Sequence, residues 1–321
     1  MQLFAGYDSG GSKTACVLTN ERGTMLGTGF VGPSNYLYCG KGRAFASMVA
    51  STEGAFRQAG LPLGSLKAAY VGSAAIRLHN GASHLPFFRS CIEAETVLCE
   101  SDIVPIWYGA VREKPAVVTI AGTGSITYVC QKERFIRVSG WGPLLGDEGS
   151  GYDLGRMALI TAIRMVDGRE PEDCAFVRVL FDFFEANEPR DLVLSLNQGD
   201  TRSKVATAAR PVFLLYEQGN QTACRLLHRS AKEIALAVSA ALKQAAASEK
   251  LPLILAGSLL RPQEVLFSLV KEKLSKENAP LSEYLPPQVH PAAAAAALAL
   301  NSQGLREAAE TLLQNAKGAL L

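Results

Sequence analysis

The chain has 321 residues, of which 48% are hydrophobic and 19% are charged. These values describe an ordinary globular protein with sizeable cores, and at ~100–200 residues per domain the length predicts two domains. The net charge of +2 comes from scattered lysines and arginines, without the basic stripe that binds a nucleic-acid backbone. We therefore expect no nucleic-acid partner.

Cysteine usage and apolar runs indicate the cellular compartment. The seven cysteines include no C-x-x-C pair, and most of them lie in apolar segments. We interpret them as buried, reduced thiols, which are typical of a cytosolic protein. The N-terminal segment lacks the basic region of a signal peptide, and the longest apolar run, residues 291–300, is shorter than the ~18 residues of a membrane span. We expect a soluble cytoplasmic protein with no membrane partner.

The first third of the chain alternates short apolar strands with glycine turns. The pattern predicts strands over 2–8, 15–19 and 25–32, a helix over about 41–60, a strand over 68–74, a helix, a strand over 95–100 and a helix over 102–112.

Near Pro115 the same order of elements begins again. Strand, glycine turn and strand are predicted over 116–130 and a third strand over 134–142, followed by helices over about 149–167 and 221–247 with others between them. A strand over 251–258, a helix over 262–276 and two terminal helices complete the chain. This repetition predicts two α/β domains that share one topology.

Three glycine-rich turns follow predicted strands. They read DSGGSKT at 8–14, AGTGS at 121–125 and LAGSLL at 255–260. Glycines leave backbone N–H groups open to an anion, but none of these turns is a P-loop or a dinucleotide fingerprint. Any one of these turns, taken by itself, is sufficiently explained as a tight hairpin. Their matching places in a repeated domain favour turns that hold nucleotide phosphates.

Several acidic residues stand near these turns and strand ends. Asp8 ends the first strand, where a carboxylate would hold hydrated Mg²⁺ or start an Asx turn. Asp102 follows a buried strand and is either a helix N-cap or a general base at the carboxyl end of a strand. Asp147 and Glu148 stand between glycines before a predicted helix, where helix capping is the simple explanation.

Together these residues resemble the N-acetylglucosamine kinase/BadF-type ATPase family, within the superfamily of actin, sugar kinases and heat-shock chaperone ATPases. The resemblance rests on DSGGSKT, on GTGS at 122–125 and on GWG…GDEGS at 140–150, and it covers nearly the whole chain. It implies an α/β fold of two ribonuclease-H-like domains flanking an interdomain cleft. We place the N-terminal domain at 1–115 plus 303–321 and the C-terminal domain at 116–302.

The resemblance implies an ATP-dependent kinase. Such an enzyme transfers the γ-phosphoryl group of Mg-ATP to a hydroxyl, typically the 6-hydroxyl, of N-acetylglucosamine or a related hexosamine. Asp102 is the implied general base. The expected partner is a small-molecule sugar, the expected cofactors are ATP and Mg²⁺, and a homodimer is common in the family.

Matching positions imply roles for single residues. The implied nucleotide-binding residues are Gly10, Gly11, Ser12, Lys13, Thr14, Gly122, Thr123, Gly124, Gly219, Gly257 and Ser258, and the implied Mg²⁺ ligand is Asp8. The implied sugar-binding residues are Asn35, Asp102, Trp141, Gly142, Asp147 and Glu148, with a helix cap as the alternative for Glu148. Ser9 replaces a usual glycine and Asn220 a common aspartate, small polar changes that should preserve the turns.

Other functions fit parts of the pattern. Within the kinases, glucosamine and N-acetylmuramic acid are alternative substrates. Some relatives are ATPases that activate radical dehydratases or reductases through an iron–sulfur cluster, which needs a cysteine just ahead of the G-T-G turn, where this chain has Ala121. A non-catalytic sugar-sensing module on the same fold is a third alternative, and the acids Asp8, Asp102 and Asp147 favour an enzyme over it.

Overall fold

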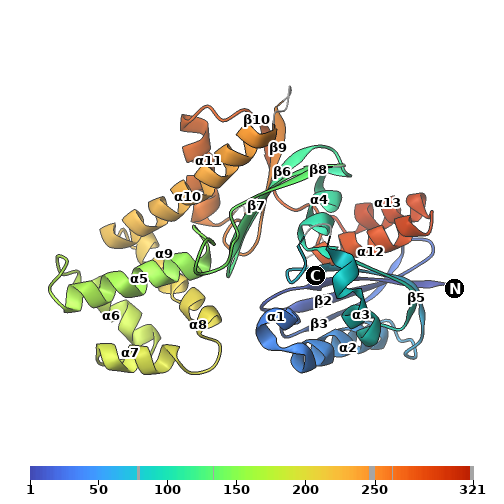
Figure 1. Ribbon diagram of the computed structural model, residues 1–321, viewed down its shortest axis with the longest axis horizontal. Helices are drawn as coiled ribbons and strands as arrows, with labels where there is room; N and C mark the ends of the chain where they lie inside the picture. Colours follow the sequence, from blue (N-terminus) through green and yellow to red (C-terminus); the bar gives the residue numbers. More distant parts are fainter. Residues whose placement is uncertain (78–79, 133, 246–249, 262, 319–321) are drawn as a thin grey trace. The chain divides into compact units, whose positions relative to one another are not determined.

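Two mixed sheets organise the chain in the computed structural model, which describes residues 1–77, 80–132, 134–245, 250–261 and 263–318 (Figure 1). Each sheet has five strands among these residues. Each sheet also belongs to a separate compact unit, the first formed by Met1–Lys114 with Pro287–Leu321 and the second by Pro115–Pro286.

The first unit is built on a sheet of strand order β3-β2-β1-β4-β5. Its strands are β1 (Leu3–Ser9), β2 (Thr14–Asn20), β3 (Met25–Val31), β4 (Leu66–Ser73) and β5 (Ala94–Ser101). Its helices are α1 (Tyr36–Cys39), α2 (Lys41–Gln58), α3 (Gly81–Cys91), α4 (Ile103–Val111), α12 (Pro291–Ser302) and α13 (Arg306–Asn315). The first three strands are antiparallel neighbours, while β4 runs parallel to β1 and β5 parallel to β4.

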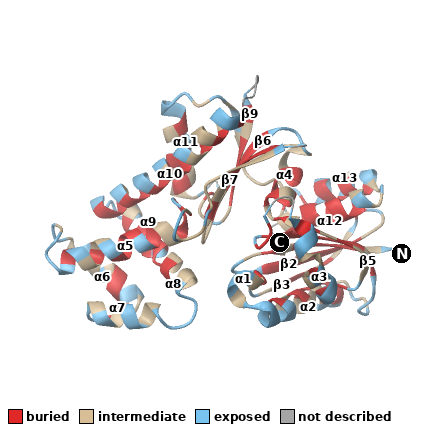
Figure 2. Ribbon diagram, viewed as in Figure 1, coloured by how far each residue is buried: buried red, intermediate tan, exposed pale blue. Residues whose placement is uncertain are grey.

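Strand β1 is buried on both faces of this sheet. Phe4 joins the core that includes α12 and α13, whereas Ala5 and Tyr7 join the core on the side of α2, because successive side chains of a strand point to opposite faces. A Cβ on Gly6 would lie 1.9 Å from the backbone nitrogen of Ala296. The backbone of α12, which is buried along most of its length, therefore packs directly on β1 (Figure 2).

This packing corrects one predicted domain boundary. The units divide at Pro286/Pro287, so α12 belongs to the first unit and not to the domain that we predicted over 116–302. An alanine run is apolar on every side and so carries no indication of which sheet it covers. Only the match between small side chains and Gly6 selects β1.

The second unit repeats the strand order of the first, as β8-β7-β6-β9-β10. Its strands are β6 (Ala116–Ala121), β7 (Ser125–Gln131), β8 (Arg134–Val138), β9 (Leu251–Ala256) and β10 (Leu281–Leu285). Its helices are α5 (Gly151–Val166), α6 (Cys174–Phe183), α7 (Pro189–Leu196), α8 (Thr201–Thr207), α9 (Ala209–Glu217), α10 (Gln221–Ala245) and α11 (Val265–Lys276). The predicted shared topology is confirmed.

Two strands differ from the sequence prediction. β10 was not predicted, because it is a short edge strand with no fully buried residue and so lacks an alternating pattern. β8 ends at Val138 rather than near residue 142, since left-handed backbone at Ser139 and Gly140 ends the extended conformation. The predicted start of the helix at residue 262 lies outside the described residues, and α11 begins at Val265.

All seven cysteines are free thiols, but not all are buried as expected. Cys16, Cys91, Cys99 and Cys130 are buried, Cys39 and Cys224 are partly exposed, and Cys174 is exposed. Cys174 is exposed because it opens α6 beside the capping residue Asp173. Within the described part of the chain, no helix is both long and apolar enough to span a membrane.

Candidate active site

Asp8 and Asp102 lie at the carboxyl ends of β1 and β5, with β4 between those strands. Asp8 pairs in register with Gly72 of β4, and a Cβ on Gly72 would lie 3.6 Å from the Cα of Asp102. The backbone N–H of Asp102 donates to the carbonyl of Ser73 at 3.3 Å. The missing side chain at Gly72 thus lets the two acids approach each other across one strand.

Both carboxyl groups have a raised pKa. Burial and, to a lesser extent, the charge of Asp102 raise the pKa of Asp8 to about 7, against a partial offset by Lys13. Burial also raises the pKa of Asp102, against a hydrogen bond of 3.2 Å from the Ser101 hydroxyl. Asp102 occupies the N-cap position of α4 but makes no side-chain capping hydrogen bond. Capping therefore does not explain this acid, which favours a functional role at the strand end.

The turn after β1 anchors the segment that holds Asn35. The carbonyl of Gly10 accepts hydrogen bonds from the backbone N–H groups of Ser34 at 3.1 Å and Asn35 at 3.0 Å. The side chain of Asn35, 2% exposed, accepts from the N–H of Leu37 and caps α1. The structure thus brings the predicted sugar residue Asn35 together with the first predicted phosphate turn.

A buried chain of hydroxyl groups lies between these loops. Ser34 Oγ lies 2.7 Å from Thr14 Oγ1 and 2.9 Å from Ser9 Oγ, and Ser73 Oγ lies 3.2 Å from Ser9 Oγ. All four side chains are fully buried. The hydroxyl of Thr14 is therefore engaged inside the protein, which leaves only its backbone for a nucleotide. Ser9 lies at the centre of these linked hydroxyl groups, and its residue type alone did not predict that role.

The tip of the first turn is open. Gly11, Ser12 and Lys13 are exposed, and a Cβ on Gly11 would meet no atom within 4 Å. Gly11 does not have a positive φ either, so neither packing nor conformation requires glycine there. The absence of a side chain instead leaves room for a ligand close to the backbone.

The start of α12 lies beside this turn. His290 caps α12 by accepting a hydrogen bond from the N–H of Ala292 at 3.1 Å. Burial and, to a lesser extent, the charge of Lys13 lower the pKa of His290 to about 4. His290 could not be predicted from the sequence, since a lone histidine before a proline has no characteristic spacing.

In the second unit, the N-terminus of α5 holds the turn between β6 and β7. The N–H of Gly151 donates to the carbonyl of Gly122 at 2.7 Å, and the N–H of Tyr152 donates to the carbonyl of Thr123 at 3.1 Å. Two carbonyl oxygens of the turn therefore face the helix. These two carbonyl oxygens, which would repel an anion, therefore point away from the side of the turn where an anion would bind.

The third glycine turn lies next to the second. Gly257 has a φ of 94°, and a Cβ there would lie 2.2 Å from the carbonyl oxygen of Ala121. A Cβ on Gly122 would lie 3.5 Å from Ser258 Oγ. Backbone conformation and close approach both require glycine at 257, and together they bring Ser258 against the turn at 122–125.

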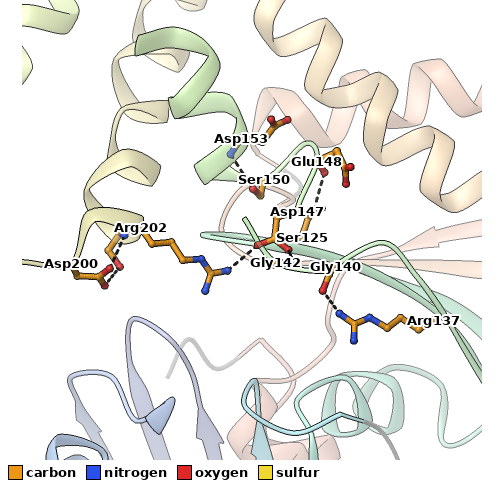
Figure 3. A network of polar contacts seen from close by, with 11 residues as sticks. Ser125, Arg137, Gly140, Gly142, Asp147, Glu148, Ser150, Asp153, Asp200 and Arg202 are labelled. Carbon is orange, nitrogen blue, oxygen red and sulfur yellow. Dashed lines mark hydrogen bonds and ion pairs between the residues drawn. The ribbon is translucent and has the colours of Figure 1, made fainter. Parts of the chain in front are cut away.

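The acidic pair at 147–148 separates into two different environments (Figure 3). Asp147 is 3% exposed and has a left-handed φ of 58°. Its carboxylate accepts from the N–H of Gly142 at 3.2 Å and pairs with Arg202 of α8 at 2.9 Å. Glu148 is exposed, and its carbonyl accepts from the hydroxyl of Ser125 at 2.8 Å.

The cap of α5 is formed by other residues. Ser150 Oγ accepts from the N–H of Asp153 at 3.1 Å, and the carboxylate of Asp153 accepts from the N–H of Gly149 at 3.0 Å. Ser150 and Asp153, and not Glu148, therefore cap α5, which corrects the helix-cap alternative for Glu148. The exposed carboxylate of Glu148 keeps its sugar contact as a prediction.

Trp141 and Gly142 lie on the loop between β8 and α5. Trp141 is 56% exposed, and the guanidinium of Arg137 lies 4.0 Å from the centre of its ring. Arg137 also donates to the carbonyl of Gly140 (Figure 3). Gly142 has a φ of 91°, and a Cβ there would meet no atom within 4 Å. An exposed aromatic ring beside open backbone is suited to a ring-shaped ligand.

Gly219 and Asn220 have local structural roles. Gly219 has a φ of 79° just after α9. The amide of Asn220 donates to Asp173 at 2.9 Å, while its oxygen accepts from the N–H of Ala223 at 2.9 Å in the first turn of α10. Helix termination and capping account for both residues, and the adenosine contact of Gly219 stays a prediction.

Comparison with known proteins assigns the family. The model of the BadF/BadG/BcrA/BcrD ATPase family matches residues 5–299. The chain belongs to this family. The resemblance inferred from the glycine turns and the GDEGS segment is therefore confirmed.

Relatives of this BadF/BadG/BcrA/BcrD family member include named kinases. An N-acetylmuramic acid/N-acetylglucosamine kinase of Clostridium acetobutylicum is 28% identical over 279 residues, which span 86% of this chain and 91% of that protein. An N-acetyl-D-glucosamine kinase of Dictyostelium discoideum is 27% identical over 317 residues, which span 94% and 99%.

A solved structure confirms the predicted two-domain α/β fold. A protein of Chromobacterium violaceum, described as a candidate N-acetylglucosamine kinase, superposes with a TM-score of 0.77 at 24% identity. The match covers 94% of this chain and 99% of that one.

Besides His290, two further features of this family member were not predicted from the sequence. One is the hydroxyl chain around Ser9, and the other is the pairing of Arg202 with Asp147. Both join residues that are distant in sequence, and a single serine or arginine carries no pattern that names its partner.

Proposed function

We propose that the chain is an ATP-dependent amino-sugar kinase. It transfers the γ-phosphoryl group of ATP to a hydroxyl, the 6-hydroxyl in our proposal, of N-acetylglucosamine or a related hexosamine. Membership of an ATPase family and the names of the two kinase relatives support this reaction. The observation that carries it is Asp102, a partly buried carboxyl with a raised pKa that caps no helix and is linked through Ser73 and Ser9 to the Asn35 turn.

Asp102 acts in this proposal as the general base. A base of this kind removes the proton of the sugar hydroxyl as it attacks phosphorus, which contributes roughly 10²–10⁴-fold to the rate. The Ser101 hydroxyl lies 3.2 Å from Asp102 Oδ1 and would hold the carboxylate in one orientation. Most of the remaining acceleration of a phosphoryl transfer comes from positioning and charge neutralisation.

The other predicted site residues are divided between binding of the sugar and binding of the nucleotide. Binding of the sugar is assigned to Asn35, Trp141, Gly142, Asp147 and Glu148 as well as Asp102, and binding of the nucleotide to the residues at 10–14, 122–124, 219 and 257–258. The open backbone at Gly11 supports the nucleotide role, and the exposed ring of Trp141 supports the sugar role. With its Oδ1 engaged as the α1 cap, Asn35 would offer its Nδ2 amide to a sugar hydroxyl.

Mg²⁺ fits the environment of Asp8. No cluster of three or more histidine, cysteine, aspartate or glutamate side chains suited to a metal occurs among the described residues, and Mg²⁺ in kinases is bound by one or two carboxylates with waters and phosphates. A bound cation would relieve the repulsion between Asp8 and Asp102, which adds to the effect of burial in raising the pKa of Asp8. When bound, Mg²⁺ neutralises negative charge on the nucleotide phosphates.

A cytoplasmic location and a homodimer complete the proposal. The location is supported by seven free thiols, which is the usual state of cysteines in a reducing compartment. Sedimentation velocity of the purified chain measures its oligomeric state.

An ADP-release assay across a sugar panel tests the proposed reaction. With Mg-ATP, we expect sugar-dependent ADP release for at least one of N-acetylglucosamine, glucosamine and N-acetylmuramic acid, and no comparable release for glucose. Phosphorus NMR of the product identifies the phosphorylated hydroxyl. Absence of sugar-dependent ADP release with every hexosamine would overturn the proposal.

The same sugar panel distinguishes N-acetylmuramic acid, the second candidate substrate, from N-acetylglucosamine. N-acetylmuramic acid is favoured by the Clostridium acetobutylicum relative, which carries both N-acetylmuramic acid and N-acetylglucosamine in its name. A higher kcat/KM for N-acetylmuramic acid than for N-acetylglucosamine would select it as the main substrate.

A further inference from the structure

The ion pair between Asp147 and Arg202 is unusual in its burial. Asp147 has the most buried carboxylate among the ion pairs of the described chain, with a side chain 4% exposed, and the partner side chain of Arg202 is 23% exposed. The two residues are 55 positions apart in sequence, and both belong to the second unit. Removing two charges from water is costly, so a pair at this depth calls for an explanation other than general stability.

Both charged groups lie against the glycine turn at 122–125. A Cβ on Gly124 would lie 2.7 Å from Arg202 Nη2 and 2.8 Å from Asp147 Oδ2. Gly124 does not have a positive φ, so its backbone conformation does not require glycine. The close approach of the guanidinium and the carboxylate requires it instead, and Arg202 is thereby held directly beside the turn.

The surroundings of the pair hold the carboxylate in one position. Asp147 accepts a second hydrogen bond from the N–H of Gly142 and has left-handed backbone, which costs an aspartate energy. Figure 3 shows the side chain of Arg202 extending from α8 to Asp147. It also shows the hydrogen bond from the Ser125 hydroxyl of the turn to the backbone carbonyl of Glu148. Loop, turn and helix α8 therefore converge on the Arg202 guanidinium.

We propose that Arg202 binds the phosphoryl group that ATP transfers, and that Asp147 is the residue that positions its guanidinium. This inference rests on the proposed kinase function and adds a residue to it. A guanidinium keeps its charge at all working pH values and matches the geometry of phosphoryl oxygens. Negative charge spreads over the equatorial oxygens of the transferred group in the transition state, and a fixed cation beside the turn stabilises it.

Asp147 also neutralises the charge of Arg202 when no nucleotide is bound. A guanidinium beside the turn without a counter-charge would be a partly buried, unpaired cation. The carboxylate supplies the counter-charge and fixes the orientation, so that no rearrangement of Arg202 is needed when phosphate arrives. No proton moves between the two residues.

Nucleotide binding without sugar tests the role of Arg202. The Kd values of the ATP analogue AMPPNP and of ADP, both with Mg²⁺, are measured by calorimetry for the wild type, Arg202→Met and Arg202→Lys. Loss of one charge-assisted contact weakens binding roughly 10–100-fold, so we expect that loss for AMPPNP with Arg202→Met and a much smaller one for ADP. Arg202→Lys keeps the charge without the planar fork and should recover part of the AMPPNP affinity.

Lys204→Met is the matched control. Lys204 lies in the same helix, and its ammonium donates to the carbonyl of Ser195 at 2.7 Å. The variant removes one positive charge from α8 without changing a contact of the turn. Because charges that do not contact the ligand contribute little, we expect the affinities for both nucleotides to stay within about twofold of the wild type.

A double-mutant cycle tests the positioning role of Asp147. If Asp147 acts through Arg202, Asp147→Asn should weaken AMPPNP binding in the wild-type background and have little further effect in Arg202→Met. Sugar is absent from this measurement, so a sugar contact of Asp147 does not influence it. Fully additive losses would overturn the positioning role.

The outcomes separate this inference from the kinase proposal. Arg202→Met with unchanged AMPPNP affinity, or with equal losses for AMPPNP and ADP, would overturn the role of Arg202 while leaving the reaction intact. Thermal unfolding checks that each variant is folded, and if Arg202→Met is not, the same comparison is decided by Arg202→Lys. A wild-type chain that binds neither nucleotide would instead overturn the kinase proposal.

Discussion

At the scale of single residues, Asp8 and Asp102 influence each other through space. They stand on either side of Gly72, and the charge of Asp102 adds to the effect of burial in raising the pKa of Asp8. Two partly buried carboxylates without a cation between them disfavour the folded state when both are ionised. The pair therefore lowers the stability of the folded state, which favours a functional role for the two acids. Each acid can be tested separately.

The first prediction concerns Asp102. Asp102→Asn keeps the side-chain volume but cannot accept a proton, so kcat should fall about 10²–10⁴-fold. Sugar and nucleotide affinities, measured by calorimetry, should change little. Ser101→Ala is the companion variant, because it removes only the hydrogen bond to Asp102, and it should lower kcat far less. A kcat for Asp102→Asn close to that of the wild type would exclude Asp102 as the base.

The second prediction concerns pH and Asp8. Its pKa is raised from an ordinary 3.8 to about 7 in the folded state, so the folded protein holds this proton more tightly than the unfolded chain does. The resulting stability is fully present below about pH 3.8 and is lost as the pH rises to about 7. Asp8→Asn does not titrate and avoids this loss.

The measurement is the Tm of both proteins without nucleotide or metal. The Tm of Asp8→Asn relative to the wild type should increase between pH 5 and pH 7.5 and then level off, by about 2–4 °C for each kcal/mol of relieved cost. A Tm difference that does not change with pH would mean that the raised pKa of Asp8 is not realised in solution.

At the scale of elements, backbone contacts decide where glycine is required. Helix α12 lies on β1 at Gly6 with no space for a side chain, whereas the backbone at Gly11 faces open space. The two glycines are five residues apart in one sequence stretch, yet the first is needed for packing of helix on strand. The second leaves room for a ligand.

The third prediction compares Gly6→Ala with Gly11→Ala. A methyl group at position 6 would overlap the α12 backbone. Overpacking typically lowers the free energy of unfolding by about 1–3 kcal/mol and occasionally by more, and we expect a loss of about 3 kcal/mol or more here. Gly11→Ala should leave the Tm nearly unchanged and raise the KM for ATP. Thermal unfolding and steady-state kinetics measure both effects. Equal Tm values for the two variants would contradict the close packing of α12 on β1.

At the scale of the whole molecule, the chain crosses from one unit to the other twice. The second unit is one continuous segment, Pro115–Pro286, with its own buried core. The first unit needs both ends of the chain, because α12 and α13 supply much of the core that covers β1, β2 and β4. The two tryptophans are divided between the units, with Trp107 buried in the first and Trp141 exposed in the second.

The fourth prediction follows from this division. A fragment of residues 115–286 should fold alone and unfold cooperatively, whereas a fragment of residues 1–114 should not fold without 287–321, since one face of its sheet would be exposed. Circular dichroism measures both fragments. In the full chain, the buried Trp107 reports unfolding of the first unit in a Trp141→Phe variant. A cooperatively folded 1–114 fragment would contradict the essential role of α12.

The sequence by itself determined the α/β class, most of the repeated order of strands and the three glycine turns, and it singled out Asp8, Asp102 and Asp147 as candidate site residues. These features depend on local periodicity and on residue types with restricted roles, which can be recognised within short windows. The family could be inferred in the same way, from several short motifs at a given spacing.

Only the tertiary structure decided which distant segments meet. It assigned α12 to β1, placed Ser9 in a buried chain of hydroxyls, gave the cap of α5 to Ser150 and Asp153, and paired Arg202 with Asp147. The physical reason is that a serine, an arginine or an alanine-rich helix can satisfy its hydrogen bonds, charge or apolar surface with many partners. Close packing in three dimensions selects one of them.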